Sequence, residues 1–140
     1  MNYGISQLSI VPMRDDPSDK SEMINQILFG EHFKILEARK KWSRIRLAHD
    51  SYEGWICNKQ VLEISEDDYK QLDKDISTIT TDILDIIKKD QHQPIVIGSI
   101  LPFYKSGHAN INSEMYEFNG LTTPGFVKKQ KLVENALIFL

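Results

Sequence analysis

Short apolar stretches, separated by polar turns, recur through the first 64 residues of this 140-residue chain. The candidate strands run from Leu8 to Pro12, Ile24 to Phe29, His32 to Ala38, Trp42 to Ala48, Tyr52 to Cys57 and Val61 to Ile64. Strands so short and so closely spaced favour a small barrel, because closing the sheet removes the strand edges that would pair with other chains. We therefore predict a small β-barrel over residues 1–64.

Alternation along the strand from Trp42 indicates which of its side chains are buried. Trp42, Ile45 and Leu47 are predicted to lie in the core, while Arg44 and Arg46 point outward. We also place Trp55 in the core, since burial is the usual fate of a strand tryptophan.

A helical period begins at Ser65, which is predicted to cap a helix whose first turn is acidic. The apolar residues that follow have helical spacing and are Tyr69, Leu72, Ile76, Ile79, Ile83, Ile86 and Ile87. Lys88 and Lys89 suit a helix C-terminus. We predict an acidic helical connector over residues 65–92, made of two short helices or one bent helix.

Strand character returns after this connector. The candidate strands are 94–98, 99–104 and 114–118, and the candidate turns are 105–107, 119–120 and 123–125. Residues 93–127 are therefore predicted to form a second, smaller β unit. Leu132, Ala136 and Leu140 then mark an apolar face of a helix over residues 128–140. The expected fold class is mainly β with a helical connector.

Composition narrows the possible functions. The net charge is −3, and residues 65–90 carry the whole acidic excess, which argues against nucleic acid as the main partner. No stretch approaches the roughly 18 apolar residues of a membrane span, so no membrane partner is expected. The N-terminus has no signal-peptide pattern. The expected location is cytoplasmic if Met1 is the natural start, and the cell envelope otherwise.

Few residues here suggest catalytic chemistry. The single cysteine, Cys57, lies in an apolar strand pattern and is predicted to be a small buried side chain. The histidines are His32, His49, His92 and His108, and no two have the spacing of metal ligands. We expect no metal, no cofactor and no Cys–His catalytic pair, so this chain alone should not be an enzyme.

Three motifs together resemble a known bacterial family. They are Arg14-x-x-Pro17-Ser18-x-x-Ser21-Glu22 with Gln26-x-Leu28-x-Gly30-Glu31, Trp42-x-x-Ile45-x4-Asp50-x-Tyr52-x-Gly54-Trp55, and Gly98-Ser99-x-Leu101-Pro102. The combination resembles the tandem of bacterial SH3 (SH3b) domains that precedes an NlpC-type cysteine peptidase. The resemblance implies an SH3-like barrel, helices, a second SH3-like unit, and a terminal helix that leads into a peptidase domain absent from this sequence.

The same resemblance implies a function and a partner. Enzymes of this kind cut murein peptides of the L-Ala-γ-D-Glu-diamino acid type, and the tyrosine of the D-x-Y-x-G-W hairpin faces the catalytic cleft. The matching residue is Tyr52, whose hydroxyl would contact the free amine of an N-terminal L-Ala while its ring blocks longer substrates. Asp50 would offset the ammonium charge or simply stabilise the turn. The chain would then be a non-catalytic specificity and targeting region for a C-terminal peptidase domain.

Two other functions fit the residues. A free-standing SH3-like module could bind murein peptides or a protein partner. A cluster of basic residues could hold a few phosphates, and its members are Arg39, Lys40, Lys41, Arg44 and Arg46. Glu37 and Glu53 lie close in sequence, and interleaved aromatic residues that stack on bases are lacking, so we interpret this cluster as a solvated hairpin.

Overall fold

The computed structural model describes residues 2–125, so the helix predicted over residues 128–140 lies outside the described part. Seven strands form one antiparallel sheet in the order β3-β2-β6-β5-β4-β1-β7. Their bounds are β1 Tyr3–Ile5, β2 Ile10–Arg14, β3 Met23–Leu28, β4 His32–Ala38, β5 Trp42–Leu47, β6 Glu53–Cys57 and β7 Leu62–Glu63. A short 3-10 helix, Asn58–Gln60, joins β6 to β7. We call this part the N-terminal unit.

The predicted strands of the N-terminal unit are confirmed to within a few residues. One difference concerns Pro12, which was expected to end a strand but lies inside β2, opposite Gln26 of β3. Proline is tolerated there because β2 is bonded along its length to β3 and reaches β6 only at Arg14, opposite Trp55. The first strand, β1, is too short for its pattern to be read from the sequence.

Helix α1, Glu66–Lys74, follows the N-terminal unit. The predicted cap is confirmed, since the Ser65 hydroxyl accepts a hydrogen bond from the Asp68 amide at 3.1 Å. The second half of the predicted helical connector is wrong. The chain from Thr78 onward forms strands, because β-branched threonines and isoleucines there pair with distant strands, and Ile83 is 81% exposed instead of lying on a buried helix face.

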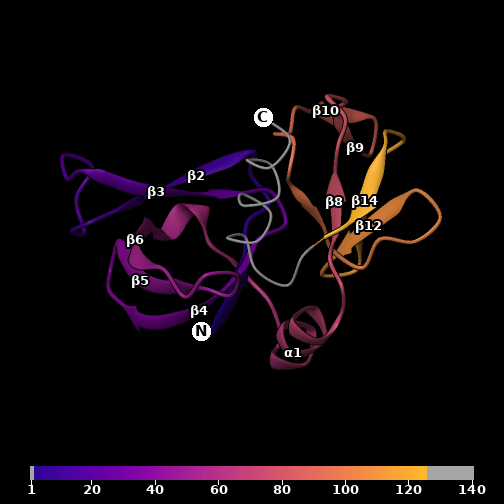
Figure 1. Ribbon diagram of the computed structural model, residues 1–140. Coiled ribbons are helices and arrows are strands. Elements are labelled where there is room, and N and C mark those ends of the chain that lie inside the picture. Colours follow the sequence, from indigo (N-terminus) through magenta and orange to yellow (C-terminus); the bar gives the residue numbers. More distant parts are fainter. Residues whose placement is uncertain (1, 126–140) are drawn as a thin grey trace, which may run out of the picture.

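The C-terminal unit consists of two small antiparallel sheets, in the orders β10-β9-β13-β12 and β11-β8-β14. The bounds are β8 Thr78–Thr80, β9 Ile86–Lys88, β10 Gln91–Gln93, β11 Ile100–Leu101, β12 His108–Ile111, β13 Glu114–Glu117 and β14 Thr122–Pro124. The mainly β fold class is therefore confirmed. Figure 1 shows the two units side by side, with α1 at the foot of the gap between their ribbons.

Several details of the C-terminal unit differ from the predictions. Residues 94–98 are not a strand, and Thr123 and Pro124 belong to β14, opposite Ile79 and Thr78, instead of forming a turn. Tight hairpin turns lie at Lys89 and Asp90, between β9 and β10, and at Asn112 and Ser113, between β12 and β13, where all of these residues have positive φ angles. Such angles are those of a type I′ turn, which matches the twist of paired strands.

Two hydrophobic cores hold the molecule together. The N-terminal core lies within the N-terminal unit and is made of Val11, Met13, Ile27, Phe33, Ile35, Ile45, Leu47 and Ile56. The shared core lies between the units and is made of Ile5, Phe29, Ile64, Leu72, Ile86, Ile95, Leu101, Ala109, Ile111, Tyr116 and Phe118. Since the shared core takes Ile5 and Phe29 from the N-terminal unit and Leu72 from α1, the units pack as one structure.

Backbone contacts also join the two units. The Ile100 amide donates to the Phe29 carbonyl at 2.9 Å. Gly30 has a φ of +81°, and a Cβ at this position would lie 1.9 Å from the Ile100 carbonyl oxygen. Glycine is therefore required at position 30 both by its backbone angle and by this close approach. None of the helices within residues 2–125 has the length and apolar character needed to cross a membrane.

Candidate functional site

The predicted site residues Asp50 and Tyr52 lie in the loop that joins β5 to β6. The Leu47 amide donates to the Tyr52 carbonyl at 2.9 Å, and the Ser51 amide donates to the Leu47 carbonyl at 3.0 Å. Ser51 adopts a positive φ of 59°. The Asp50 carboxylate accepts from the Tyr52 amide at 3.0 Å, which is the Asx turn considered as one role for this residue. The loop backbone that carries Tyr52 is thus fixed by three hydrogen bonds.

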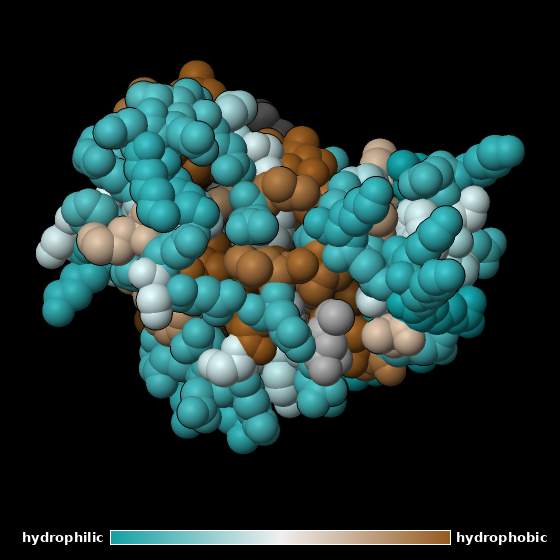
Figure 2. Space-filling model, turned by 180° about the vertical axis from the view of Figure 1, so that it is seen from behind, coloured by the Kyte–Doolittle hydropathy of each residue, from teal (hydrophilic) through white to brown (hydrophobic). Residues whose placement is uncertain are grey.

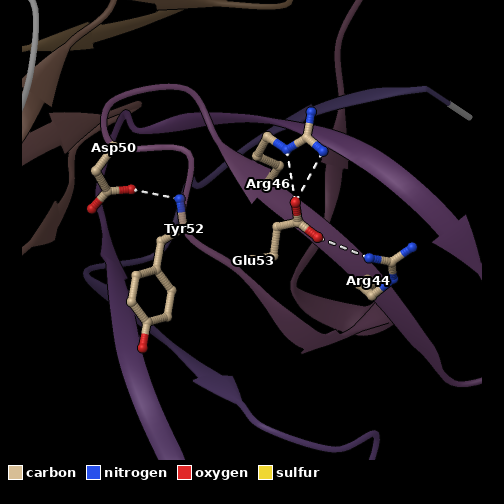
Figure 3. Close-up of polar contacts among 5 residues, drawn as sticks. All are labelled: Arg44, Arg46, Asp50, Tyr52 and Glu53. Carbon is tan, nitrogen blue, oxygen red and sulfur yellow. Dashed lines mark hydrogen bonds and ion pairs between the residues drawn. The ribbon is translucent and has the colours of Figure 1, made fainter.

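The side chain of Tyr52 is open to solvent, with 42% of its surface exposed. In Figure 3 its ring extends away from Glu53 and the two arginines, while Asp50 turns toward the Tyr52 amide. A phenol displayed in this way offers a flat apolar face and a hydroxyl that donates or accepts a hydrogen bond. The structure therefore places Asp50 and Tyr52 together on one rigid loop.

The basic residues of the same hairpin are already paired. Glu53 bridges Arg44 and Arg46, with N–O distances of 2.8 and 2.9 Å (Figure 3). Arg39 pairs with Glu37, and its guanidinium lies 4.5 Å from the centre of the Trp55 ring. Three of the five basic groups thus have acidic partners, which weakens the field a phosphate backbone would need.

The predicted core residues of this region are mostly buried. Ile45 and Leu47 are fully buried and Trp55 is 8% exposed. Trp42 is only half-buried, so the prediction that it belongs to the core is wrong; it begins β5, where the sheet is less covered. Cys57, expected to be buried, is also half-buried and lies opposite Trp42 in β6.

A second group of polar residues was not predicted as a site. Glu31, His32, His49 and Asp73, which we call the junction cluster, meet where the β5–β6 loop and α1 approach the start of β4. His32 Nε2 lies 2.7 Å from Asp73 Oδ1, and His49 Nε2 lies 3.7 Å from Glu31 Oε2. The two imidazole rings are 6.0 Å apart. Because Asp73 is 41 residues from His32, no local spacing signals this arrangement.

Three members of the junction cluster are deeply buried. Glu31, His32 and His49 are only 3%, 4% and 8% exposed. One Glu31 oxygen accepts from the Leu28 amide at 2.8 Å, which ties the cluster to the β3–β4 turn. A cavity of about 240 Å³ lies beside the cluster and is lined in part by both histidines and Asp73.

Burial governs ionisation in the junction cluster. It lowers the pKa of His32 below the ordinary 6.5, because the charged imidazolium loses its hydration, and the hydrogen bond and charge of Asp73 oppose this only in part. Tyr69 of α1, whose ring lies 5.1 Å from that of His32, has its pKa raised, first by burial and then by the Asp73 charge. Among residues 2–125, no group of three or more His, Cys, Asp or Glu side chains is arranged to hold a metal ion.

Comparison with known proteins finds a family match within the N-terminal unit. Residues 13–61 match the bacterial dipeptidyl-peptidase SH3 domain family, a span that contains the hairpin with Asp50 and Tyr52. No curated protein sequence matches the chain. Among solved structures, an NlpC/P60 family protein from Bacillus cereus ATCC 10987 is similar with a TM-score of 0.68 and 10% identity.

The structural match extends beyond the SH3 domain. It covers 88% of this chain and 57% of the Bacillus cereus protein, so the chain spans little more than half the length of that protein. At this level of identity the match establishes the fold that both units form together. The SH3 family match over residues 13–61 and the fold shared with an NlpC/P60 family protein bear out the predicted resemblance.

Proposed function

We propose that this chain, which carries a bacterial SH3 domain of the dipeptidyl-peptidase family, is the non-catalytic substrate-specificity region of an NlpC-type cysteine peptidase that cuts murein peptides. The observation that supports this most directly is the exposed Tyr52 on a loop fixed by three hydrogen bonds within that domain. A rigid loop is what a specificity contact needs, because little ordering is required when the ligand binds.

In this proposal Tyr52 limits substrates to those with a free N-terminal L-Ala. Its hydroxyl accepts a hydrogen bond from the ammonium group, and its ring blocks any chain that extends beyond the terminus. One Asp50 oxygen already holds the Tyr52 amide, so the main role of Asp50 is to fix the loop. Its negative charge, exposed beside Tyr52, adds a weak attraction for the ammonium group.

A titration of the 140-residue chain with the tripeptide L-Ala-γ-D-Glu-diaminopimelate tests the contact directly, using NMR shifts to detect weak binding. We expect Tyr52→Phe to weaken binding about tenfold, since a hydrogen bond to a charged group contributes about 1.5–3 kcal/mol. N-acetylation of the tripeptide should cause a similar loss. Met23→Ala, which removes another exposed side chain of the same unit, is the matched control.

A second substitution at the same position, made in the intact enzyme, tests the role in specificity. Tyr52→Ala should relax the requirement for a free L-Ala terminus, so that peptides extended at this end are cut relatively faster. Unchanged selectivity would contradict the proposal. Affinity for the tripeptide in the separate chain, combined with unchanged selectivity in the enzyme, would favour the alternative of a free-standing peptide-binding module.

A further inference from the structure

The buried ring of His32 has a defined protonation pattern. The Asp73 carboxylate accepts a hydrogen bond from Nε2, so the neutral ring carries its proton on Nε2 and a lone pair on Nδ1. His32 Nδ1 is buried and has no hydrogen-bond partner among the described residues. Burying the lone pair of Nδ1 without a donor costs little free energy. A protonated Nδ1 would bury a charged donor without an acceptor, which costs far more.

The loop that carries Tyr52 is held at its base by His32 and its surroundings. The Ala48 amide donates to the His32 carbonyl at 3.1 Å. The next residue, His49, inserts its ring beside that of His32 and lies 3.7 Å from the Glu31 carboxylate. His49 is only three residues from Tyr52. A rearrangement of the junction cluster therefore acts on the segment from which Tyr52 projects.

The surroundings of the cluster permit such a rearrangement. The residues that line the cavity of about 240 Å³ include His32, Asp73 of α1, and Ala48 and His49 of the β5–β6 loop. Its volume would hold several water molecules, each of which occupies about 30 Å³ in the liquid. A charged imidazole that turns toward the cavity can be hydrated there, and the loop and α1 then separate.

We propose that the junction cluster is an acid-sensitive latch in which neutral His32 positions the Tyr52 loop, and protonated His32 releases it. This inference rests on the proposed role of Tyr52. The groups that face His32 are Asp73 and Tyr69 from α1, His49 from the β5–β6 loop, and Glu31 from the β3–β4 turn. The negative charge of Asp73 favours protonation of His32, and burial of the imidazole ring disfavours it. His32 is a positioning residue, since it acts on the ligand only through the loop.

Fluorine NMR of the 3-fluorotyrosine-labelled chain tests the latch without any ligand. The Tyr52 resonance is assigned by its loss in Tyr52→Phe, and is followed from about pH 7 to about pH 5, a range in which histidines titrate while the fluorophenol stays protonated. We expect it to shift with a midpoint below 6.5, because burial lowers the pKa of His32. The Tyr104 resonance should stay constant, since its hydroxyl is bonded to the Phe118 carbonyl in the C-terminal unit.

Two variants assign the transition. His32→Gln should abolish it, and Asp73→Asn should move it to lower pH, because the carboxylate that raises the pKa of His32 is lost. Asp73 has a half-exposed side chain, so this variant should fold even if His32→Gln does not. His92→Asn, which removes an exposed histidine of the C-terminal unit, is the control and should leave the midpoint unchanged.

A Tyr52 resonance that does not move with pH, or a transition that persists in His32→Gln and disappears in His49→Asn, would overturn the latch. The proposed function fails by a separate route, which is the absence of tripeptide binding at pH 8. If the latch and the proposed function both hold, tripeptide affinity in the wild-type chain should fall as the pH is lowered. The midpoint should equal that of the Tyr52 resonance, and the fall should be absent in His32→Gln.

Discussion

The two hydrophobic cores of the molecule differ in which parts of the chain supply their side chains. The N-terminal core uses residues between Val11 and Ile56, all within the N-terminal unit. The shared core contains most of the buried residues of the C-terminal unit together with Ile5 and Phe29 of the N-terminal unit. The N-terminal unit thus has a core of its own, whereas we expect the C-terminal unit to depend on the N-terminal unit for its stability.

The largest expected effect comes from Gly30→Ala, which attacks the contact between the units. The new methyl group would overlap the Ile100 carbonyl oxygen. The alanine at position 30 would also have to keep a left-handed φ of +81°. We expect the free energy of unfolding to fall by more than ~4 kcal/mol, a loss that is exceptional among single substitutions. Urea denaturation of the variant measures this loss. Gly98→Ala is the control, since a Cβ there meets no atom within 4 Å although φ is also positive.

Two phenylalanines compare the cores directly. Phe29 belongs to the shared core and Phe33 to the N-terminal core, and both are fully buried. Changing either phenylalanine to alanine should lower the free energy of unfolding by about 3–5 kcal/mol. Hydrogen exchange should distinguish them, because Phe29→Ala exposes the amides of β8 to β14 first, while Phe33→Ala exposes both units together. If the N-terminal unit lost protection first in Phe29→Ala, the proposed dependence would be reversed.

The junction cluster makes stability depend on pH. The pKa of His32 is lower in the folded chain than the ordinary 6.5, so the unfolded chain binds more protons between the two values. The free energy of unfolding should therefore be greatest above pH 6.5. It should decrease as the pH falls toward the pKa of His32 in the folded chain. Chemical denaturation at a series of pH values measures the slope, which should flatten in His32→Gln and persist in His92→Asn.

The smallest expected effect concerns α1, which supplies Leu72 to the shared core and Asp73 to the junction cluster. Ser65→Ala removes the cap hydrogen bond to the Asp68 amide and should cost about 1 kcal/mol. Thermal denaturation gives the loss, with the exposed Thr81→Ala as the control. A loss at Ser65 no larger than at Thr81 would show that tertiary packing alone holds the helix.

The sequence predicted the N-terminal unit well because β2 to β6 are five to seven residues long, which is enough to show an apolar pattern. The pattern at Ile45 and Leu47, with Arg44 and Arg46 outside, is local and was read correctly. The C-terminal unit was predicted less well. Its strands are two to four residues long, so they are too short to show a period. Ile79, Ile83 and Ile86 have helical spacing by coincidence. Sheet pairing overrides it, since Ile79 pairs with β11 and β14 and Ile86 pairs with β10.

The polar residues around the candidate site were likewise predictable only where they lie close together in the sequence. The hairpin with Asp50 and Tyr52 is a continuous motif, so its residues and the turn role of Asp50 were foreseen. The junction cluster was missed, because His32, His49 and Asp73 have no recognisable spacing. They meet only when α1 packs against the start of β4. No pattern in the sequence indicates which histidine will be buried beside a carboxylate.

Elements that depend on neighbouring residues could be predicted without the structure: the longer strands of the N-terminal unit, the Ser65 cap and the loop that displays Tyr52. Alternation, capping and turn chemistry act over a few residues, so they can be read locally. The shared core, the requirement for Gly30 and the ionisation of His32 follow only from the folded structure. They depend on contacts between distant segments, because burial and close approach arise only when those segments pack together.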